Sequence, residues 1–174
     1  MPTSEPANIT PLLQRIIGLD PRSVLDIGAG YGKWGFLLRE YLDDFLGERR
    51  IDGVEVHRPY VNRSPAPHIY DLLLTVEFPG PMSGALQEHY DLALMIDVLE
   101  HYTVEDGKRA LDAALRLAPQ VLICTPLDYP QGDVFGNQFE RHLSEWRPED
   151  LVPFGAWSDF SEGRFTRGLL RRVP

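Results

Sequence analysis

The stretch Val24–Gly35, V-L-D-I-G-A-G-Y-G-K-W-G, decides the fold expected for this chain of 174 residues. Its apolar start suits a buried parallel strand, and three glycines at alternate positions, Gly28, Gly30 and Gly32, free the backbone for a tight turn. Apolar residues at helical spacing follow over 34–45. Strand, glycine turn and helix predict a cradle for a nucleotide-like ligand, because glycine lets the main chain approach and the helix N-terminus offers N–H donors.

An acidic residue beside this turn narrows the class of ligand. Asp26 stands two residues before Gly28, and a carboxylate about 5 Å from one pyrophosphate charge would repel it by about 3 kcal/mol at an effective dielectric near 20. Lys33 occupies the place of the third glycine of a dinucleotide fingerprint, and Trp34 follows where a P-loop has Ser or Thr. The turn favours S-adenosylmethionine (SAM), which is cationic and carries no phosphate. The alternative is a plain structural corner with a surface Asp.

The run D-I-G-A-G-Y-G over 26–32 resembles the first motif of the class I SAM-dependent methyltransferases of the small-molecule type, and later motifs follow in order. The resemblance covers residues 22–127 and, more loosely, 136–170. It implies an α/β, Rossmann-like fold, with a mostly parallel seven-stranded sheet, helices on both faces and a C-terminal antiparallel hairpin. It also implies that SAM is the cofactor and that Asp26, Gly28 and Gly30 contact it.

A second strand is expected over 51–56, with Glu55 near its carboxyl end. In the family that this chain resembles, an acid at this place accepts hydrogen bonds from both ribose hydroxyls, and a carboxylate has two oxygens for two donors. The resemblance therefore implies that Glu55 and its neighbour Val56 contact the cofactor. An exposed acid at the end of a strand is the alternative.

A short third strand is expected over 69–70, with Asp71 directly after it. This position matches the family's acid that accepts the adenine amino group. The resemblance implies that Asp71 does so here and that the main-chain N–H of Leu72 meets a ring nitrogen. Alternatively, Asp71 caps the next segment.

The run Y-D-L-A-L-M-I-D-V-L-E-H-Y over 90–102 predicts a fourth strand that ends in a polar cluster. It resembles the family's fourth motif, which implies that Asp97 lies near the methionine end of the cofactor. Main chain around Asp97 and Val98 would then meet the cofactor's ammonium. The strand is expected beside the first one, across the reversal in strand order where open α/β sheets bind ligands.

Two histidines are candidates for a catalytic base. His101 follows the fourth strand, where a neutral imidazole would take a proton from an incoming acceptor, and His142 is the second candidate. The alternative is that Glu100 and His101 open the following helix, whose N-cap would be Thr103. No metal site is expected, because no metal-ligand spacing occurs and the adjacent side chains of Glu100 and His101 diverge on a helix.

The chain is expected to form a single domain over 1–174. Residues 1–20 should contain a helix that either covers the cofactor as a lid or pads the sheet. A long loop on the acceptor side is expected over 126–147, with aromatic residues that wall a pocket or pack as core. A short helix is expected over 82–90, and the pattern over 156–170 predicts the final hairpin.

Composition restricts the partners. The formal net charge of −9 argues against nucleic acid, which normally demands a basic face. Cys124 is the single cysteine, so no intrachain disulfide is possible. No apolar run is long enough to span a bilayer and the N-terminus does not resemble a signal peptide, so a cytoplasmic protein without a membrane partner is expected. The oligomeric state stays open.

The expected function is SAM-dependent methyl transfer to N, O or C of a small molecule. Because the sulfonium is already an activated donor, alignment and exclusion of water can supply much of the acceleration. Two other classes stay open. One is a SAM-binding protein that does not methylate, either a sensor or a partner of another enzyme. The other is an RNA or protein methyltransferase, against which the acidic balance weighs.

Overall fold

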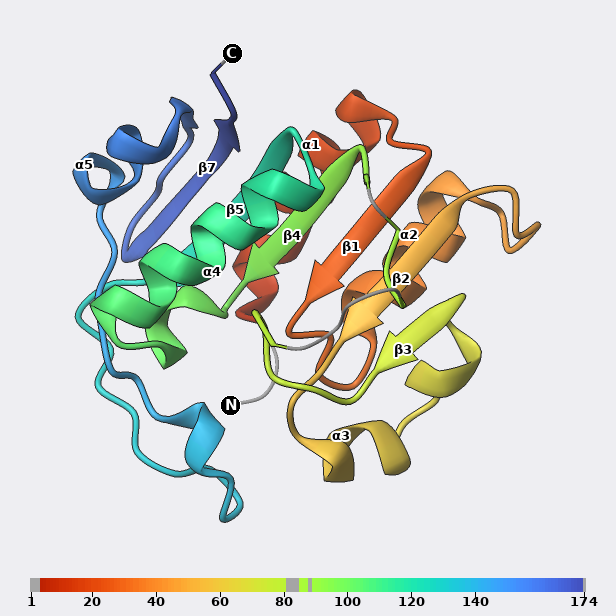
Figure 1. The fold of residues 1–174 in the computed structure, drawn as a ribbon, viewed down its shortest axis with the longest axis horizontal. Coiled ribbons are helices and arrows are strands. Elements are labelled where there is room, and N and C mark those ends of the chain that lie inside the picture. The colour runs from red at the N-terminus through yellow and green to blue at the C-terminus, as the bar shows by residue number, and fades with distance from the viewer. Residues whose placement is uncertain (1–3, 81–84, 88, 174) are drawn as a thin grey trace.

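A computed structural model describes residues 4–80, 85–87 and 89–173. Within them seven strands form one sheet (Figure 1): β1 (Ser23–Ile27), β2 (Arg50–Val54), β3 (Leu72–Leu74), β4 (Leu92–Ile96), β5 (Gln120–Pro126), β6 (Ala156–Asp159) and β7 (Phe165–Arg171). The strand order is β3-β2-β1-β4-β5-β7-β6. The first five strands pair in parallel, and β7 is antiparallel to both β5 and β6. The predicted fold class is confirmed.

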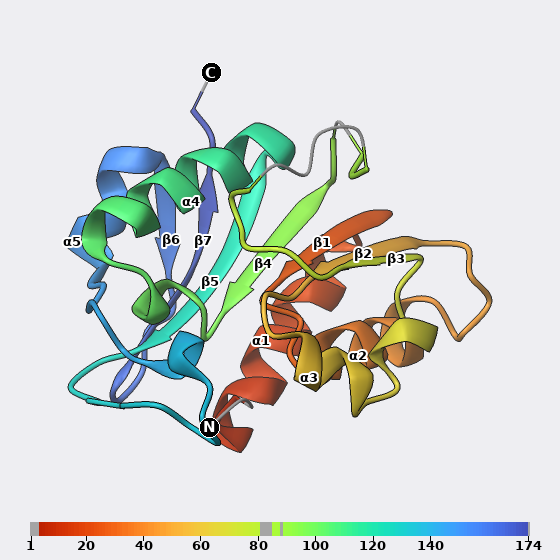
Figure 2. The same cartoon turned by 60° about the horizontal axis from the view of Figure 1, so that its bottom comes forward.

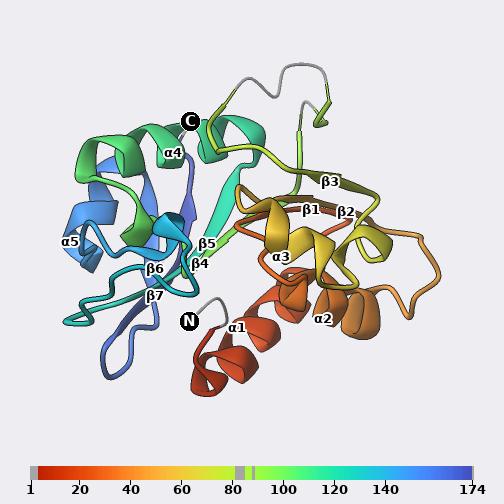
Figure 3. The ribbon, with the colours of Figure 1, turned by 90° about the horizontal axis from the view of Figure 1, so that it is seen from below.

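Helices cover both faces of the sheet (Figures 2 and 3). One face carries α1 (Pro6–Leu19) and α2 (Lys33–Leu42), and the other carries α4 (Val104–Leu117) and α5 (Pro148–Leu151). The short α3 (Arg58–Asn62) lies beyond the carboxyl end of β2. Four 3₁₀ turns complete the described elements: η1 (Ala66–His68), η2 (Leu99–His101), η3 (Gln138–Glu140) and η4 (Val152–Phe154).

The core lies on both sides of the central strands. Side chains alternate along a strand, so in β1 Leu25 joins the cluster under α4, whereas Val24 joins the cluster under α1 and α2. Every residue of β4 is buried, as expected for a parallel strand covered on both faces. The cap of α4 is also as predicted: Oγ1 of Thr103 accepts the N–H of Asp106 at 3.2 Å.

Two expected elements are wrong. The third strand runs over Leu72–Leu74 and not over 69–70, because Ile69 and Tyr70 leave η1 and pack into the cluster under α2. The second is the helix expected over 82–90: residues 85–87, 89 and 90 are not helical, and 81–84 and 88 lie outside the described residues. The N–H of Gln87 is donated to the hydroxyl of buried Tyr90 instead of to a helical carbonyl.

None of the described helices is both long enough and apolar enough to cross a membrane.

Candidate functional site

A cavity of about 400 Å³ opens at the carboxyl ends of β1, β2 and β4. The carboxyl ends of parallel strands meet at one edge, and the order reverses between β1 and β4, so a crevice is expected there. Its walls come from the turn 27–34, residues 54–56, residues 76–78, residues 96–98, and the side chains of Tyr60, Asn137, Phe139 and Glu140. The cavity therefore collects the ends of four strands and part of the loop after β5.

The glycine turn forms one wall as the sequence predicted. Gly28 has a φ of +78°, and a Cβ added there would lie 2.5 Å from Cγ2 of Val98. The N–H groups of Gly28 and Ala29 both donate to the carbonyl of Val54. These bonds hold the turn against the end of β2. Val98 packs where a side chain at position 28 would lie, so this position requires glycine.

Glu55 bridges this turn and the residues after β2. Its Oε2 accepts the N–H of Gly30 at 2.8 Å and its Oε1 accepts the N–H of His57 at 2.7 Å. Burial raises the pKa of Glu55, although these backbone donors favour the carboxylate. Glu55 and Val56 both line the cavity.

Asp97 directly follows β4 and has a left-handed backbone conformation, with a φ of +55°. Its Oδ2 is buried and has no hydrogen-bond partner among the described residues. Burial raises the pKa of Asp97, against the effect of Ser4 and of the Lys33 ammonium. Val98 lies beside it, and both residues line the cavity. A buried acceptor without a partner at a cavity wall is a place where a ligand donor fits.

Asp26 does not line this cavity, contrary to the expectation from sequence. Its side chain points from β1 toward α2, where Oδ2 accepts the Tyr70 hydroxyl at 2.5 Å. Tyr70 in turn accepts the N–H of Gly35. Burial raises the pKa of Asp26 to about 7. The alternation of side chains along β1 thus directs Asp26 into the core, and the acidic charge at the cavity comes from other residues.

Asp71 and Leu72 also lie outside this cavity, contrary to the expectation from sequence. Because β3 starts at Leu72, Asp71 lies at the amino end of the strand, opposite the cavity. There its Oδ2 accepts the N–H of Ile51 at 2.7 Å and pairs with Arg39 at 2.9 Å. The residues that do follow β3 into the cavity are 76–78. The apolar run L-L-L-T-V over 72–76 was the signal that would have located them.

A second cavity, of about 560 Å³, shares Asp97 and His101 with the first. His142, from the loop after β5, lies in its wall, and the two imidazole rings are 5.1 Å apart. Nδ1 of His101 lies 3.2 Å from the Arg141 carbonyl. Burial lowers the pKa of both histidines. Both imidazoles are therefore neutral near pH 7, with a lone pair available.

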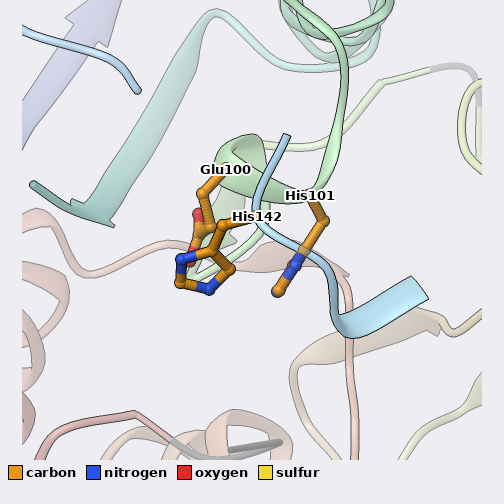
Figure 4. A group of neighbouring side chains, drawn as sticks. All are labelled: Glu100, His101 and His142. Carbon is orange, nitrogen blue, oxygen red and sulfur yellow. The ribbon is translucent and has the colours of Figure 1, made fainter. Parts of the chain in front are cut away.

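Glu100 completes a group with these two rings (Figure 4). One atom from each of Glu100, His101 and His142, a carboxylate oxygen or a ring nitrogen, lies within 4.8 Å of the others. The expectation that Glu100 and His101 diverge is therefore wrong, because η2 is a tight 3₁₀ turn and not the start of an α-helix. No short sequence motif predicts this group, because His142 lies about 40 residues after Glu100 and His101 in the chain.

No protein-family model matches the sequence, and no curated protein matches it. Solved structures do match. An O-methyltransferase family protein from Burkholderia thailandensis is 15% identical, with a TM-score of 0.64, over 94% of this chain and 55% of that one. The N-terminal domain of EvdMO1 with SAH bound is 14% identical, with a TM-score of 0.71, over 98% and 82%. Magnesium protoporphyrin IX methyltransferase (ChlM) from Synechocystis PCC 6803 with bound SAH is 13% identical, with a TM-score of 0.65, over 96% and 83%.

This chain spans about half the length of the Burkholderia protein. At such identities the likeness concerns the fold. It confirms the fold that the motifs implied, that of the class I SAM-dependent methyltransferases.

Proposed function

We propose that this protein is a SAM-dependent methyltransferase that acts on N, O or C of a small molecule. The observation that carries the proposal is the charge of the first cavity. Four carboxylates line it, those of Glu55, Glu77, Asp97 and Glu140, whereas Lys33 is the only Lys or Arg among its described lining residues. A pyrophosphate is repelled by such a wall, and the ammonium and sulfonium of SAM are attracted.

The residues present fit this cofactor. Asp97 offers the buried acceptor without a partner that an ammonium would satisfy. Glu55 has two oxygens for two ribose hydroxyls, and Gly28 and Gly30 line the cavity without side chains that would narrow it. Val56 and Val98 supply apolar wall. When bound, SAM supplies a methyl group that is already activated by the sulfonium.

The second cavity supports an enzyme rather than a sensor. A protein that only binds SAM needs one cavity, but here a second one adjoins it at Asp97 and His101, where an acceptor would meet the methyl group. His101 and His142 are the proposed residues for handling the acceptor's proton. The two structures named above with SAH bound hold the demethylated product of SAM, which supports the same cofactor here. The net charge of −9 favours a small molecule over RNA.

Calorimetry with SAH and with NAD tests the cofactor. We expect SAH to bind and NAD not to bind. Glu55→Gln should weaken SAH about 10-fold or more, because the ribose loses a charged acceptor. The matched control is Glu40→Gln, on the exposed side of α2, which should bind SAH like the wild type. Binding of NAD with no heat from SAM or SAH would refute the proposal.

Release of SAH from SAM in the presence of a mixture of small hydroxyl and amine compounds, followed by mass spectrometry, tests the activity. We expect SAH and a product heavier by one methylene unit. Tight SAH binding that depends on Glu55, without SAH formation from any acceptor, would instead favour a sensor or partner protein.

A further inference from the structure

We infer that Glu100, His101 and His142 form a binding site for a divalent transition-metal ion between the two cavities. The ligand atoms come from two segments that the fold brings together, η2 after β4 and the loop after β5 (Figure 4). One oxygen and two ring nitrogens within 4.8 Å of one another can coordinate one ion after small side-chain movements. No short sequence motif joins these three residues, so geometry alone identifies the cluster.

The imidazole rings are held as metal ligands usually are. Nδ1 of His101 lies against the Arg141 carbonyl and Nδ1 of His142 against the Tyr129 carbonyl. A carbonyl only accepts, so a neutral ring in this position carries its proton on Nδ1 and keeps the Nε2 lone pair for a cation. Such second contacts fix both tautomer and orientation in metal sites.

Buried carboxylates in and around the cluster also favour a bound cation. Glu100 is buried and accepts the Thr125 hydroxyl at 3.0 Å. Glu140 is buried as well. Neither of these two carboxylates forms an ion pair within the described part of the chain. Buried carboxylates normally have a paired charge or a metal, and a dication here would supply it.

The donor set selects the metal. Two imidazoles and one carboxylate suit Zn²⁺, Mn²⁺ or Fe²⁺, whereas Mg²⁺ and Ca²⁺ prefer oxygen ligands. Three protein ligands leave coordination positions open. Since His101 lines both cavities and His142 lines the second, these positions face the place proposed for the acceptor.

The role of the ion rests on the proposed function. A cation beside the methyl donor lowers the pKa of an acceptor hydroxyl, whose proton leaves to solvent. The oxygen lone pair then forms the O–C bond while the C–S bond breaks, and that electron pair stays on sulfur. With the ion bound, the acceptor is a hydroxyl compound, and the two histidines act as metal ligands in place of the proton-handling role proposed above.

Metal binding is measured on the full chain after dialysis against a chelator. We expect the wild type to bind about one equivalent of Zn²⁺ by calorimetry and elemental analysis. His142→Ala and Glu100→Gln should lower the affinity about 100-fold or more. With Co²⁺ as a probe, a visible absorption band should appear in the wild type and be lost in His142→Ala. The matched control is His68→Ala, at the exposed end of η1, which should bind Zn²⁺ and Co²⁺ like the wild type.

SAH affinity measured on the same proteins separates the two hypotheses. SAH binding without uptake of Zn²⁺, Mn²⁺ or Co²⁺ refutes the metal site and leaves the proposed function standing. Metal uptake that depends on His142, without SAH binding, supports the metal site and refutes the function. Equal metal uptake by the wild type and His142→Ala also overturns the site. His142→Asn serves as a second variant should alanine at 142 impair folding.

Discussion

Two acids sit inside the sheet, and each accepts a hydrogen bond from a tyrosine hydroxyl. Tyr70 donates to Asp26 on β1 at 2.5 Å, and Tyr90 donates to Asp52 on β2 at 2.6 Å. Asp52 also pairs with Arg50, whereas Asp26 has no ion pair among the described residues. Burial raises the pKa of Asp26 to about 7; the Tyr70 hydrogen bond opposes this, and the nearby Glu55 adds to it. Asp26 is therefore one of the buried acids through which pH acts on the stability of the fold.

The stability of the wild type should fall between pH 5 and pH 8. Because the folded pKa of Asp26 is about 7 and its ordinary value is 3.8, the folded state binds the extra proton within this window and loses its advantage as pH rises. Asp26 alone should contribute a loss of about 2–3 kcal/mol at 1.4 kcal/mol per pH unit. Asp26→Asn is neutral at every pH, so its unfolding free energy in urea should fall less than that of the wild type by about this amount. Asp112→Asn, on the exposed side of α4, should keep the pH dependence of the wild type. Equal pH dependence in wild type and Asp26→Asn would contradict the prediction.

At the scale of elements, α4 holds the loop that carries His142. Trp146 of this loop is buried, and its Nε1 donates to the Leu99 carbonyl of η2 at 3.1 Å. The indole packs on Gly107 of α4, where an added Cβ would lie 2.3 Å from Cζ2 of the ring. The N–H of Leu143 donates to the Glu100 carbonyl at 2.7 Å. Helix, turn and loop therefore position His142 as one unit.

Gly107→Ala should loosen this unit. Alanine gains about 1 kcal/mol of helix propensity, but overpacking against the indole costs about 1–3 kcal/mol, so a net loss near 1 kcal/mol is expected in urea unfolding. Zn²⁺ affinity should fall several-fold, while SAH affinity stays close to that of the wild type. Lys108→Ala, at the next and exposed position, should change stability by less than about 0.5 kcal/mol. Unchanged stability and metal affinity in Gly107→Ala would show that the indole does not position the loop.

At the scale of the whole molecule, one sheet contributes side chains to two hydrophobic clusters, one on each of its faces. The clusters on its two faces are built from alternating residues of the same strands, as with Leu25 and Val24 of β1. Because both clusters depend on the same strands, neither cluster can unfold while the other stays folded. We therefore propose that the chain is a single domain and unfolds as one cooperative unit.

Scanning calorimetry tests this unit. A single transition is expected, with calorimetric and van't Hoff enthalpies that agree near 120 kcal/mol, from about 0.7 kcal/mol per residue over 174 residues. SAH at about 100 times its Kd should add about 2.7 kcal/mol and raise the whole transition by about 5–10 °C. Two resolved transitions, of which SAH moves only one, would show separate units.

Several elements were predictable because their signals are local. The strand, glycine turn and helix at 24–45 follow from apolar periodicity and from glycines with positive φ, such as Gly28. The position of Glu55 at the cavity was predictable because the apolar pattern of a complete strand precedes it in the sequence. The third strand was misplaced because the choice between 69–70 and 72–74 depends on Tyr70, whose hydroxyl reaches Asp26 in a different strand.

The sequence by itself thus determined the fold class, the C-terminal hairpin and the glycine turn, since periodicity and turn chemistry act over a few residues. Only the tertiary structure decided which acids face the cavity and which enter the core, as with Glu55 and Asp26. It also decided that His142 meets Glu100 and His101. The direction of a side chain at a strand end, and a contact between segments far apart in the chain, depend on packing across the whole sheet, which no short window of sequence contains.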